Sequence, residues 1–279
     1  MADDAGKNTP PTLPRITEDR AKKLLELGKE GQRWLATYRR FGSFTQSAFE
    51  PKISDSEIVV CFADVRGFTH YCKSLQQQMQ DRKIQNFLKT HGSIYMDGLL
   101  RWYVAAEDII EPATFRVLRD LMAPTTYKNL GDGLMLVWEI PRNLETSEQS
   151  ILVTTIMKIV DSIEAVFYDR FRNLTPAETE AYSSEVESLD IGFGMAKGHA
   201  WRLDYGSSVD YAGSLVNLAA RLQDRARPRG QVIHFDVASW FLDKRATKDG
   251  DGKILTIRGI RGYDDVKVWA SKEVSEGAS

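Results

Sequence analysis

Residues 57–69, EIVVCFADVRGFT, give the strongest single indication of how this chain folds. The apolar run Ile58 to Phe62, rich in β-branched residues, predicts a buried strand that leads directly to Asp64. A carboxylate there is costly to bury alone, so we expect it to be paired, hydrogen-bonded or bound to a metal. Gly67 permits a tight turn into a helix whose exposed backbone amides would attract an anion. The alternative is that Asp64 only caps that helix.

A second segment, residues 126–138 (TYKNLGDGLMLVW), predicts two strands joined by a tight turn around Asp132. An ordinary hairpin, in which Asp132 only shapes the turn, would explain this pattern. If Asp132 and Asp64 instead meet at neighbouring strand ends, they would offer the hard oxygen ligands that divalent cations prefer. The two segments together therefore indicate a cation site beside an anion site.

A third segment, residues 207–235, predicts a helix for which Ser214 could be the cap. Asn217 and Arg221 are four positions apart, so they project from one face of that helix. They could be a simple surface pair. In front of a phosphate site, they would instead be an amide that orients a sugar and a guanidinium that matches phosphoryl charge.

Composition limits the classes of protein to consider. The chain has 279 residues, of which 42% are hydrophobic and 27% charged, enough for the core of one large domain. A net charge of −2 gives no indication of a nucleic-acid or anionic-membrane surface. The sequence has no membrane-spanning apolar run and no signal peptide, so we expect a cytoplasmic protein. Cys61 and Cys72 lack metal-type spacing and are expected to be buried thiols.

The chain is expected to form one main domain with extensions. The predicted divisions are a disordered tail at 1–14, a helical extension at 15–50, a domain at 51–272 with an insertion at about 91–124, and a flexible tail at 273–279. The insertion is expected because the stretch between Asp64 and Asp132 is longer than one crossover helix needs. It is amphipathic, and Gly98 and Pro112 are expected to interrupt it.

Four motifs in order resemble those of the class III nucleotide cyclase catalytic domain. They are FADVRGFT, KNLGDGLML, DYAGSLVNLAARLQDRA and RGIRGYDDVKVW, and the resemblance covers residues 57–271. It implies an α+β fold with a ferredoxin-like core sheet and flanking helices. It also implies a head-to-tail homodimer with active sites at the subunit interface, acting on a nucleoside triphosphate.

The resemblance assigns a role to each matching position. Asp64 and Asp132, with Val65 beside them, correspond to the ligands of two divalent cations, Mn²⁺ or Mg²⁺. Asn217 from the other subunit would position the ribose, and Arg221 would stabilise the transferring phosphate. The remaining nucleotide-binding positions are the backbone of Val65, Arg66, Gly67 and Phe68 and the side chains of Lys128, Asp210 and Arg261.

The base is the least determined part of the substrate. Lys128 and Asp210 match the positions that read the base, and adenylate cyclases commonly have a lysine with an aspartate there, whereas guanylate cyclases have a glutamate with a cysteine. A lysine donor opposite the donors of guanine would be mismatched, which leaves adenine, cytosine and uracil. Tyr127 and Tyr211 could narrow the pocket against a purine, or could simply pack in the sheet.

Whole-chain resemblance favours a pyrimidine. The length, the enlarged segment between the two aspartates and the form DYAGSLVNLAARLQDRARP resemble the bacterial pyrimidine cyclases of Pycsar antiphage systems, whose cyclic nucleotides activate a separate effector. The resulting prediction is a uridylate cyclase that converts UTP to 3′,5′-cyclic UMP. The alternatives are a cytidylate or adenylate cyclase, or a cyclase-like module that binds nucleotide without catalysis.

Overall fold

The computed structural model describes most of the chain after residue 50. The described residues are 51–77, 81–171, 189–206, 208–234, 236–239, 252–258, 260, 263, 265–271 and 274. Every helix and strand named below belongs to one compact unit, Lys52–Ser279. The predicted tail 1–14 and extension 15–50 lie outside the described residues. Of the predicted tail 273–279 only Val274 is described, and it is buried.

The described elements follow one another in this order: β1 (Lys52–Arg66), α3 (Phe68–Gln77), α4 (Asp81–Ile109), α5 (Pro112–Leu118), η2 (Arg119–Leu121), β2 (Thr126–Asn129), β3 (Gly133–Glu139), α6 (Thr146–Phe171), β4 (Asp190–Asp204), β5 (Val209–Ala212), α8 (Ser214–Arg225), β6 (Gly230–His234), β7 (Gly252–Ile257) and β8 (Val266–Ser271). Among these described strands the sheet order is β2-β3-β1-β4-β6-β8-β7, and β5 pairs with β4. The pairings between these described strands are antiparallel except that of β4 with β6, which is parallel.

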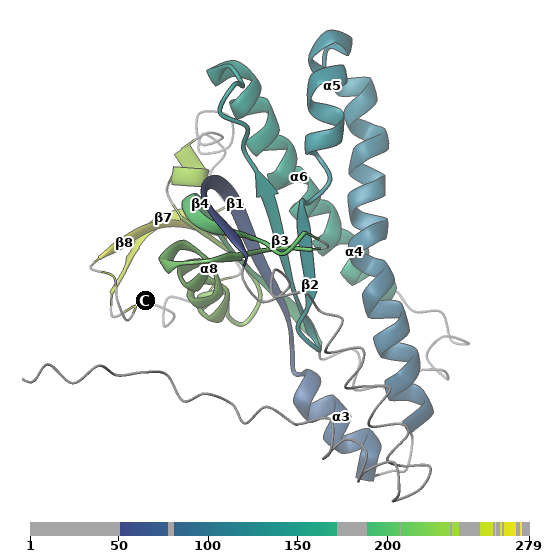
Figure 1. The fold of residues 1–279 in the computed structure, drawn as a ribbon. Helices are drawn as coiled ribbons and strands as arrows, with labels where there is room; N and C mark the ends of the chain where they lie inside the picture. The colour runs from purple at the N-terminus through teal and green to yellow at the C-terminus, as the bar shows by residue number, and fades with distance from the viewer. Residues whose placement is uncertain are drawn as a thin grey trace, which may run out of the picture. The chain divides into compact units, whose positions relative to one another are not determined.

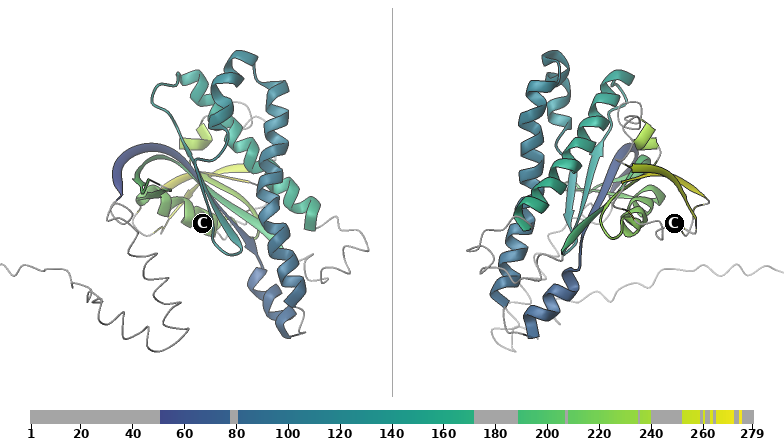
Figure 2. Two further views of the ribbon diagram at one scale, coloured as in Figure 1. Left: turned by 45° about the vertical axis from the view of Figure 1, so that its right-hand side comes forward. Right: turned by 180° about the vertical axis from the view of Figure 1, so that it is seen from behind.

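The first four strands form a ferredoxin-like core. In chain order they follow a β-α-β-β-α-β pattern, and in the sheet β1 lies between β3 and β4 with β2 at the edge. The crossovers α4 and α6 lie side by side on one face of the sheet, and α8 covers the other face (Figure 1 and Figure 2). The predicted α+β architecture with flanking helices is therefore confirmed.

Two separate cores hold the layers together, one on each face of the sheet. Along β1, Val59 and Cys61 point toward α4 and α6, whereas Ile58 and Val60 point toward α8, as alternation along a strand requires. Because both faces of β1 are covered, its central residues form the continuous apolar run seen in the sequence. None of the described helices combines the length and apolar character needed to cross a membrane.

The interruption predicted at Gly98 is wrong, because α4 runs through it without a break. A Cβ atom at Gly98 would lie 2.6 Å from the Cα of Ile163, so the glycine lets α4 pack directly against the backbone of α6. Pro112 does mark a boundary, since it begins α5, with Glu111 accepting a hydrogen bond from the Thr114 backbone at 3.0 Å.

The cap predicted for the third segment is displaced by one residue. Helix α8 begins at Ser214, and its N-cap is Gly213, with φ of 131°. That conformation is accessible mainly to glycine, so the backbone rather than a serine side chain sets the start of the helix. The hydroxyl of Tyr263 donates a hydrogen bond to the Ser214 carbonyl and holds this end of the helix in place.

Candidate active site

The two aspartates predicted to hold cations lie next to each other. Asp64 ends the β1 pairing with β3 opposite Gly133, the residue that directly follows Asp132. The Val65 amide donates a hydrogen bond of 3.3 Å to the Asp132 carbonyl, which joins the strand end to the β2–β3 turn. A Cβ atom at Gly133 would lie 3.3 Å from Oδ1 of Asp64, so glycine at this position leaves room for the carboxylate.

The charges around Asp64 favour a positive partner. Burial raises the pKa of the Asp64 carboxyl above its ordinary value of 3.8, and the charge of Asp132 raises it further. The Arg66 guanidinium opposes this shift, since its Nη1 atom lies 3.1 Å from Oδ2 of Asp64. Repulsion between two close carboxylates is the condition that a bound cation would relieve.

The ligand set suits a cation shared with a substrate rather than one enclosed by protein. Within the described part of the chain, no three His, Cys, Asp or Glu side chains gather to hold an ion. Asp64 and Asp132 would offer two hard carboxylate ligands, a set that suits Mg²⁺ or Mn²⁺ when phosphates and waters complete the shell. The residues present fit the predicted cations on this basis.

The anion site predicted from the sequence corresponds to the start of α3. Gly67 adopts φ of 82° between β1 and the helix, and its carbonyl accepts the first helical hydrogen bond, from the Tyr71 amide at 3.0 Å. Helix α3 therefore begins directly after this turn, and the N-terminus of a helix is the end whose dipole favours an anion. The Val65 amide is not available for this purpose, because it already bonds the Asp132 carbonyl.

Arg66 makes side-chain contacts that the sequence did not indicate. Only 11% of its side chain is exposed, and the guanidinium turns away from solvent toward Asp64 and the end of α8. Burial lowers the pKa of this guanidinium, and the Asp64 charge opposes the shift. The sequence had assigned Arg66 only a backbone role at the phosphate seat.

Lys128 and Asp210, the predicted base readers, also come together. The Lys128 ammonium donates a hydrogen bond to Oδ2 of Asp210, and Oδ1 of Asp210 accepts one from the Tyr211 amide at 2.7 Å. A second link between these strands runs from the Thr126 hydroxyl to the Val209 carbonyl, at 3.1 Å. A cationic donor and an anionic acceptor thus stand together on β2 and β5, with 42% and 29% of their side chains exposed.

Tyr127 and Tyr211, which could narrow a base pocket against a purine, do not lie beside the side chains of Lys128 and Asp210 in a way that would do so. Tyr127 pairs with Leu136 and faces the α4 and α6 side of the sheet, whereas Lys128 pairs with Met135 on the α8 side. Tyr211 is only 4% exposed and packs in the core beneath α8. Within this chain, the packing interpretation of Tyr211 is the one that holds, and Tyr127 faces away from Lys128.

Asn217 and Arg221 occupy the outer face of α8. Both are exposed, while Leu218 and Leu222 of the same helix are buried against the sheet. The four-residue spacing therefore places the amide and the guanidinium side by side, as predicted. Among the described residues, neither forms a hydrogen bond or ion pair with Asp64 or with the Asp132 carboxylate.

Three other residues were named from the sequence: Arg261, Cys61 and Cys72. Arg261 lies outside the described residues. Cys61 is buried, Cys72 is partly buried, and neither forms a disulfide within the described chain. Burial also raises the pKa of the Cys61 thiol, which keeps it protonated and unreactive.

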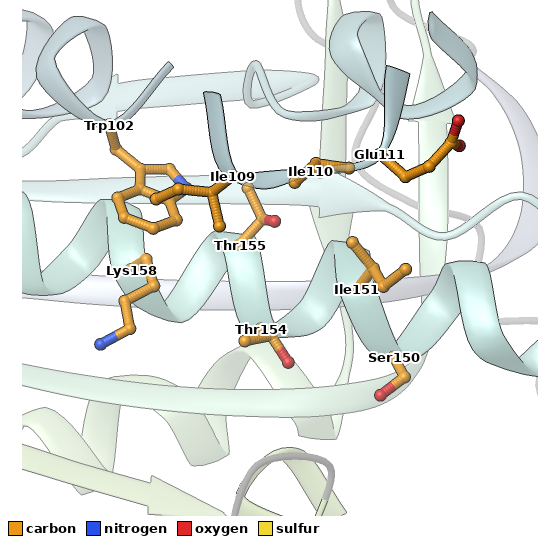
Figure 3. A pocket seen from close by; sticks show the side chains of 9 residues that line it. All are labelled: Trp102, Ile109, Ile110, Glu111, Ser150, Ile151, Thr154, Thr155 and Lys158. Carbon is orange, nitrogen blue, oxygen red and sulfur yellow. The ribbon is translucent and has the colours of Figure 1, made fainter. Parts of the chain in front are cut away.

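A cavity of about 330 Å³ between α4 and α6 is separate from this site (Figure 3). Its walls include Trp102, Ile109 and Ile151, with Thr154 and Lys158 along the α6 side. These helices cover the sheet face opposite α8, whereas the register places Asp64 on the α8 face. The cavity therefore does not take part in the arrangement described above.

Known structures share this fold. No protein-family model matches the chain, and no curated protein sequence matches it. Among solved structures, the guanylyl cyclase Cya2 is similar over 81% of this chain and 96% of its own, with 14% identity and a TM-score of 0.50. A bacterial light-regulated adenylyl cyclase is similar over 95% of this chain and 68% of its own, with 15% identity and a TM-score of 0.50.

A third example is the guanylyl cyclase domain of the RhoGC fusion protein from the aquatic fungus Blastocladiella emersonii. It is similar over 81% of this chain and 99% of its own, with 11% identity and a TM-score of 0.50. Identities this low define the fold and nothing finer. The fold is that of class III nucleotide cyclase catalytic domains, as the sequence motifs predicted.

Proposed function

We propose that this chain is a nucleotide cyclase that works as a head-to-tail homodimer. The observation that carries the proposal is the meeting of Asp64 and Asp132 at adjacent strand ends, where the Val65 amide bonds the Asp132 carbonyl at 3.3 Å. The amides at the start of α3 lie next to this pair and suit the phosphates of a nucleoside triphosphate. A cation site beside a phosphate seat is what cyclisation of such a substrate needs.

The chemistry would be an in-line displacement within the substrate. The ribose 3′-hydroxyl attacks the α-phosphorus, the bond to the β-phosphate oxygen breaks, and pyrophosphate leaves. Two divalent ions held by Asp64 and Asp132 would neutralise phosphate charge and favour loss of the hydroxyl proton. The first-turn amides of α3 would hold the β- and γ-phosphates, and Arg261 is proposed to contact the terminal phosphates as well.

The second half of each site would come from the partner subunit. Asn217 and Arg221 are exposed on α8, and within the described residues neither forms a hydrogen bond or ion pair with Asp64 or the Asp132 carboxylate, as expected if they serve a second subunit. Asn217 would orient the ribose, and Arg221 would stabilise charge that develops on the transferring phosphate. A symmetric dimer would then carry two equivalent sites.

We further propose that the substrate is UTP and the product a cyclic UMP signal in antiphage defence. The Lys128 and Asp210 pair offers one donor and one acceptor, which suits uracil, cytosine or adenine and mismatches guanine. The preference for uracil rests on whole-chain resemblance to pyrimidine cyclases, and the product would act on a separate effector. Cytidylate cyclase, adenylate cyclase and a non-catalytic binding module are the competing assignments.

A product assay separates these assignments. The purified chain is incubated with each of the four nucleoside triphosphates and Mn²⁺, and the products are identified by mass spectrometry. We expect cyclic UMP from the native chain, no product from Asp64→Asn, and unchanged product from Asp120→Asn, a control at an exposed aspartate. Cyclic AMP as the sole product would overturn the pyrimidine assignment, and absence of any cyclic nucleotide would favour the binding module.

The dimer is tested by mixing two inactive variants. Asp64→Asn removes a metal ligand, and Arg221→Ala removes the transition-state contact, so each homodimer should keep at most about 1% of native activity. If the two residues serve one site from different chains, half of the mixed dimers' sites are intact, and an equal mixture should recover roughly a quarter of native activity. A mixture that stays inactive while its subunits exchange would refute the shared site.

A further inference from the structure

The buried guanidinium of Arg66 joins two parts of the proposed machinery. Its Nη1 atom donates to Oδ2 of Asp64 at 3.1 Å, and its Nη2 atom donates to the carbonyl of Gln223. The same Nη2 atom lies 3.4 Å from the carbonyl of Ala226, just past the last turn of α8. A planar, forked cation thus links a proposed metal ligand to the end of the helix that carries Asn217 and Arg221.

The sheet is shaped to receive this side chain. Arg66 crosses over Gly192 of β4, which pairs with Asp64. A Cβ atom at Gly192 would lie 2.8 Å from Nη2 of Arg66 and 2.7 Å from the Ala226 carbonyl. Any larger residue at this position would therefore occupy the space in which the guanidinium meets the end of α8.

We propose that Arg66 is a positioning residue that ties the metal ligand of one active site to the helix that serves the other. The inference rests on the proposed dimeric cyclase, because only there do Asp64 and α8 of one chain belong to different sites. Oδ2 of Asp64 is held by the guanidinium, which leaves Oδ1 on the side of Gly133 and Asp132. Arg66 in this way sets both the direction of the carboxylate and the position of α8.

The charge of Arg66 has a second consequence. Asp64, Asp132 and Arg66 together carry a net charge of about −1 when all three are ionised. The two aspartates therefore attract a cation less strongly than they would without Arg66 beside them. A unit charge about 6 Å from a divalent ion changes its affinity by about tenfold even at the dielectric constant of water. The charge of Arg66 therefore weakens the binding of a free cation to the metal-free pair by about tenfold.

The first test measures Mn²⁺ binding without nucleotide, by electron paramagnetic resonance of the free ion. We expect Arg66→Met to bind Mn²⁺ about tenfold more tightly than the native protein, because the repelling charge is gone. Arg202→Met is the matched control, since Arg202 is also partly buried and ion-paired, with Glu139 and Asp204, and among the described residues it forms no hydrogen bond or ion pair with Asp64 or α8. Equal or weaker Mn²⁺ binding by Arg66→Met would overturn the charge argument.

The second test follows α8 by hydrogen exchange in metal-free protein. Losing the contacts to the Gln223 and Ala226 carbonyls should speed exchange in the last turn of α8 by at least about tenfold in Arg66→Met. Arg66→Lys keeps the charge but lacks the fork, so it should retain native Mn²⁺ affinity and still loosen α8. Native exchange rates in both variants would refute the tie to the helix.

Turnover supplies a discriminating signature. Arg66→Met should combine tighter Mn²⁺ binding with at least about tenfold lower kcat, a pairing that general damage to the fold does not produce. The mixed dimer of Asp64→Asn and Arg221→Ala chains keeps one intact site, which takes its Asp64 from the Arg221→Ala chain. Adding Arg66→Met to that second chain should change the Mn²⁺ dependence of turnover. Adding Arg66→Met to the first chain, Asp64→Asn, should lower kcat without changing the Mn²⁺ dependence, because that chain supplies α8 to the intact site. The same effect from Arg66→Met in either chain would overturn the proposal.

These readouts separate the inference from the proposed function. If the native chain makes no cyclic nucleotide, the proposed cyclase fails. Mn²⁺ binding and hydrogen exchange still report on Arg66 in that case, because neither needs turnover. If the native chain is active but both measurements are unchanged in Arg66→Met, the cyclase stands and the role of Arg66 is refuted.

Discussion

Replacing Asp132 by asparagine should stabilise the metal-free protein at neutral pH. The pKa of Asp64 is raised by burial and by the charge of Asp132, so ionised Asp64 costs folding free energy in the absence of a cation. Asparagine is well accepted in tight turns, so Asp132→Asn removes the charge without removing the turn. The variant therefore isolates the repulsion between the two carboxylates.

The expected size follows from Coulomb's law. Two unit charges about 5 Å apart interact by about 0.8 kcal/mol in water and by several times more at a lower effective dielectric constant. Since 35% of the Asp64 side chain is exposed, solvent screening keeps the value near the lower end, at about 1 kcal/mol. For a domain of this size, that corresponds to a rise in Tm of about 3 °C.

The pH dependence has a definite sign. The pKa of Asp64 in the folded protein lies above its ordinary value of 3.8. The free energy of unfolding therefore falls as the pH rises from about 3.8 through the folded pKa, and the full cost is present above the folded pKa. The gain in Asp132→Asn should therefore be present at about pH 7 and should fade as Asp64 becomes protonated, toward about pH 3. Thermal unfolding in EDTA at both pH values, with Asp120→Asn as an exposed control, measures it.

Addition of Mn²⁺ should reverse the order of stability. The native protein gains from a cation held by two carboxylates, whereas Asp132→Asn offers only one, so the variant should show a smaller rise in Tm. A metal-free Asp132→Asn protein that is less stable than the native chain at neutral pH would refute the repulsion. An equal response to Mn²⁺ in both proteins would refute the shared ligand set.

Three further predictions concern other parts of the unit. Gly98→Ala should lower the free energy of unfolding by about 2 to 4 kcal/mol, because the added Cβ would lie 2.6 Å from the Cα of Ile163. Denaturant titrations measure this loss. A loss below about 0.5 kcal/mol would show that α4 can move away from α6. Arg221→Ala should lower kcat about 100-fold or more with KM changed only a few-fold in steady-state assays, and a change confined to KM would exclude the transition-state role. Asp210→Asn should weaken base selectivity in competition assays, because Lys128 loses its partner, and unchanged ratios among the four nucleotides would exclude base reading by this pair.

Much of the fold could be predicted because its signals are local. The apolar run before Asp64 and the turn at Asp132 specify β1, β2 and β3, and alternation then determines which residues share a face. The interruption predicted at Gly98 failed for a tertiary reason. In an isolated helix glycine is unfavourable, but here the absent side chain permits α4 to contact α6, and that packing outweighs the intrinsic propensity.

The sequence predicted the chemical groups of the candidate site and the approach of Asp64 to Asp132, but not how the Arg66 side chain is held beside them. Asp64, Asp132, Lys128 and Asp210 could be named because each belongs to a recognisable motif. The direction of the Arg66 side chain could not, because its acceptors are backbone carbonyls of α8, which carry no mark in the sequence. Sequence reasoning identifies chemical groups, whereas contacts with a distant backbone depend on the tertiary fold.

Two glycines have a role at Asp64 that could not be predicted from the sequence. Gly133 and Gly192 flank Asp64 across the sheet, one on each neighbouring strand. Either strand alone suggests only a close approach of backbone. Gly133 leaves room for the Asp64 carboxylate, and Gly192 leaves room for the Arg66 guanidinium that binds it, so that one carboxylate oxygen can meet Arg66 while the other stays on the side of Gly133. The position of the Asp64 carboxylate thus depends on side chains that are missing from residues far away in the chain.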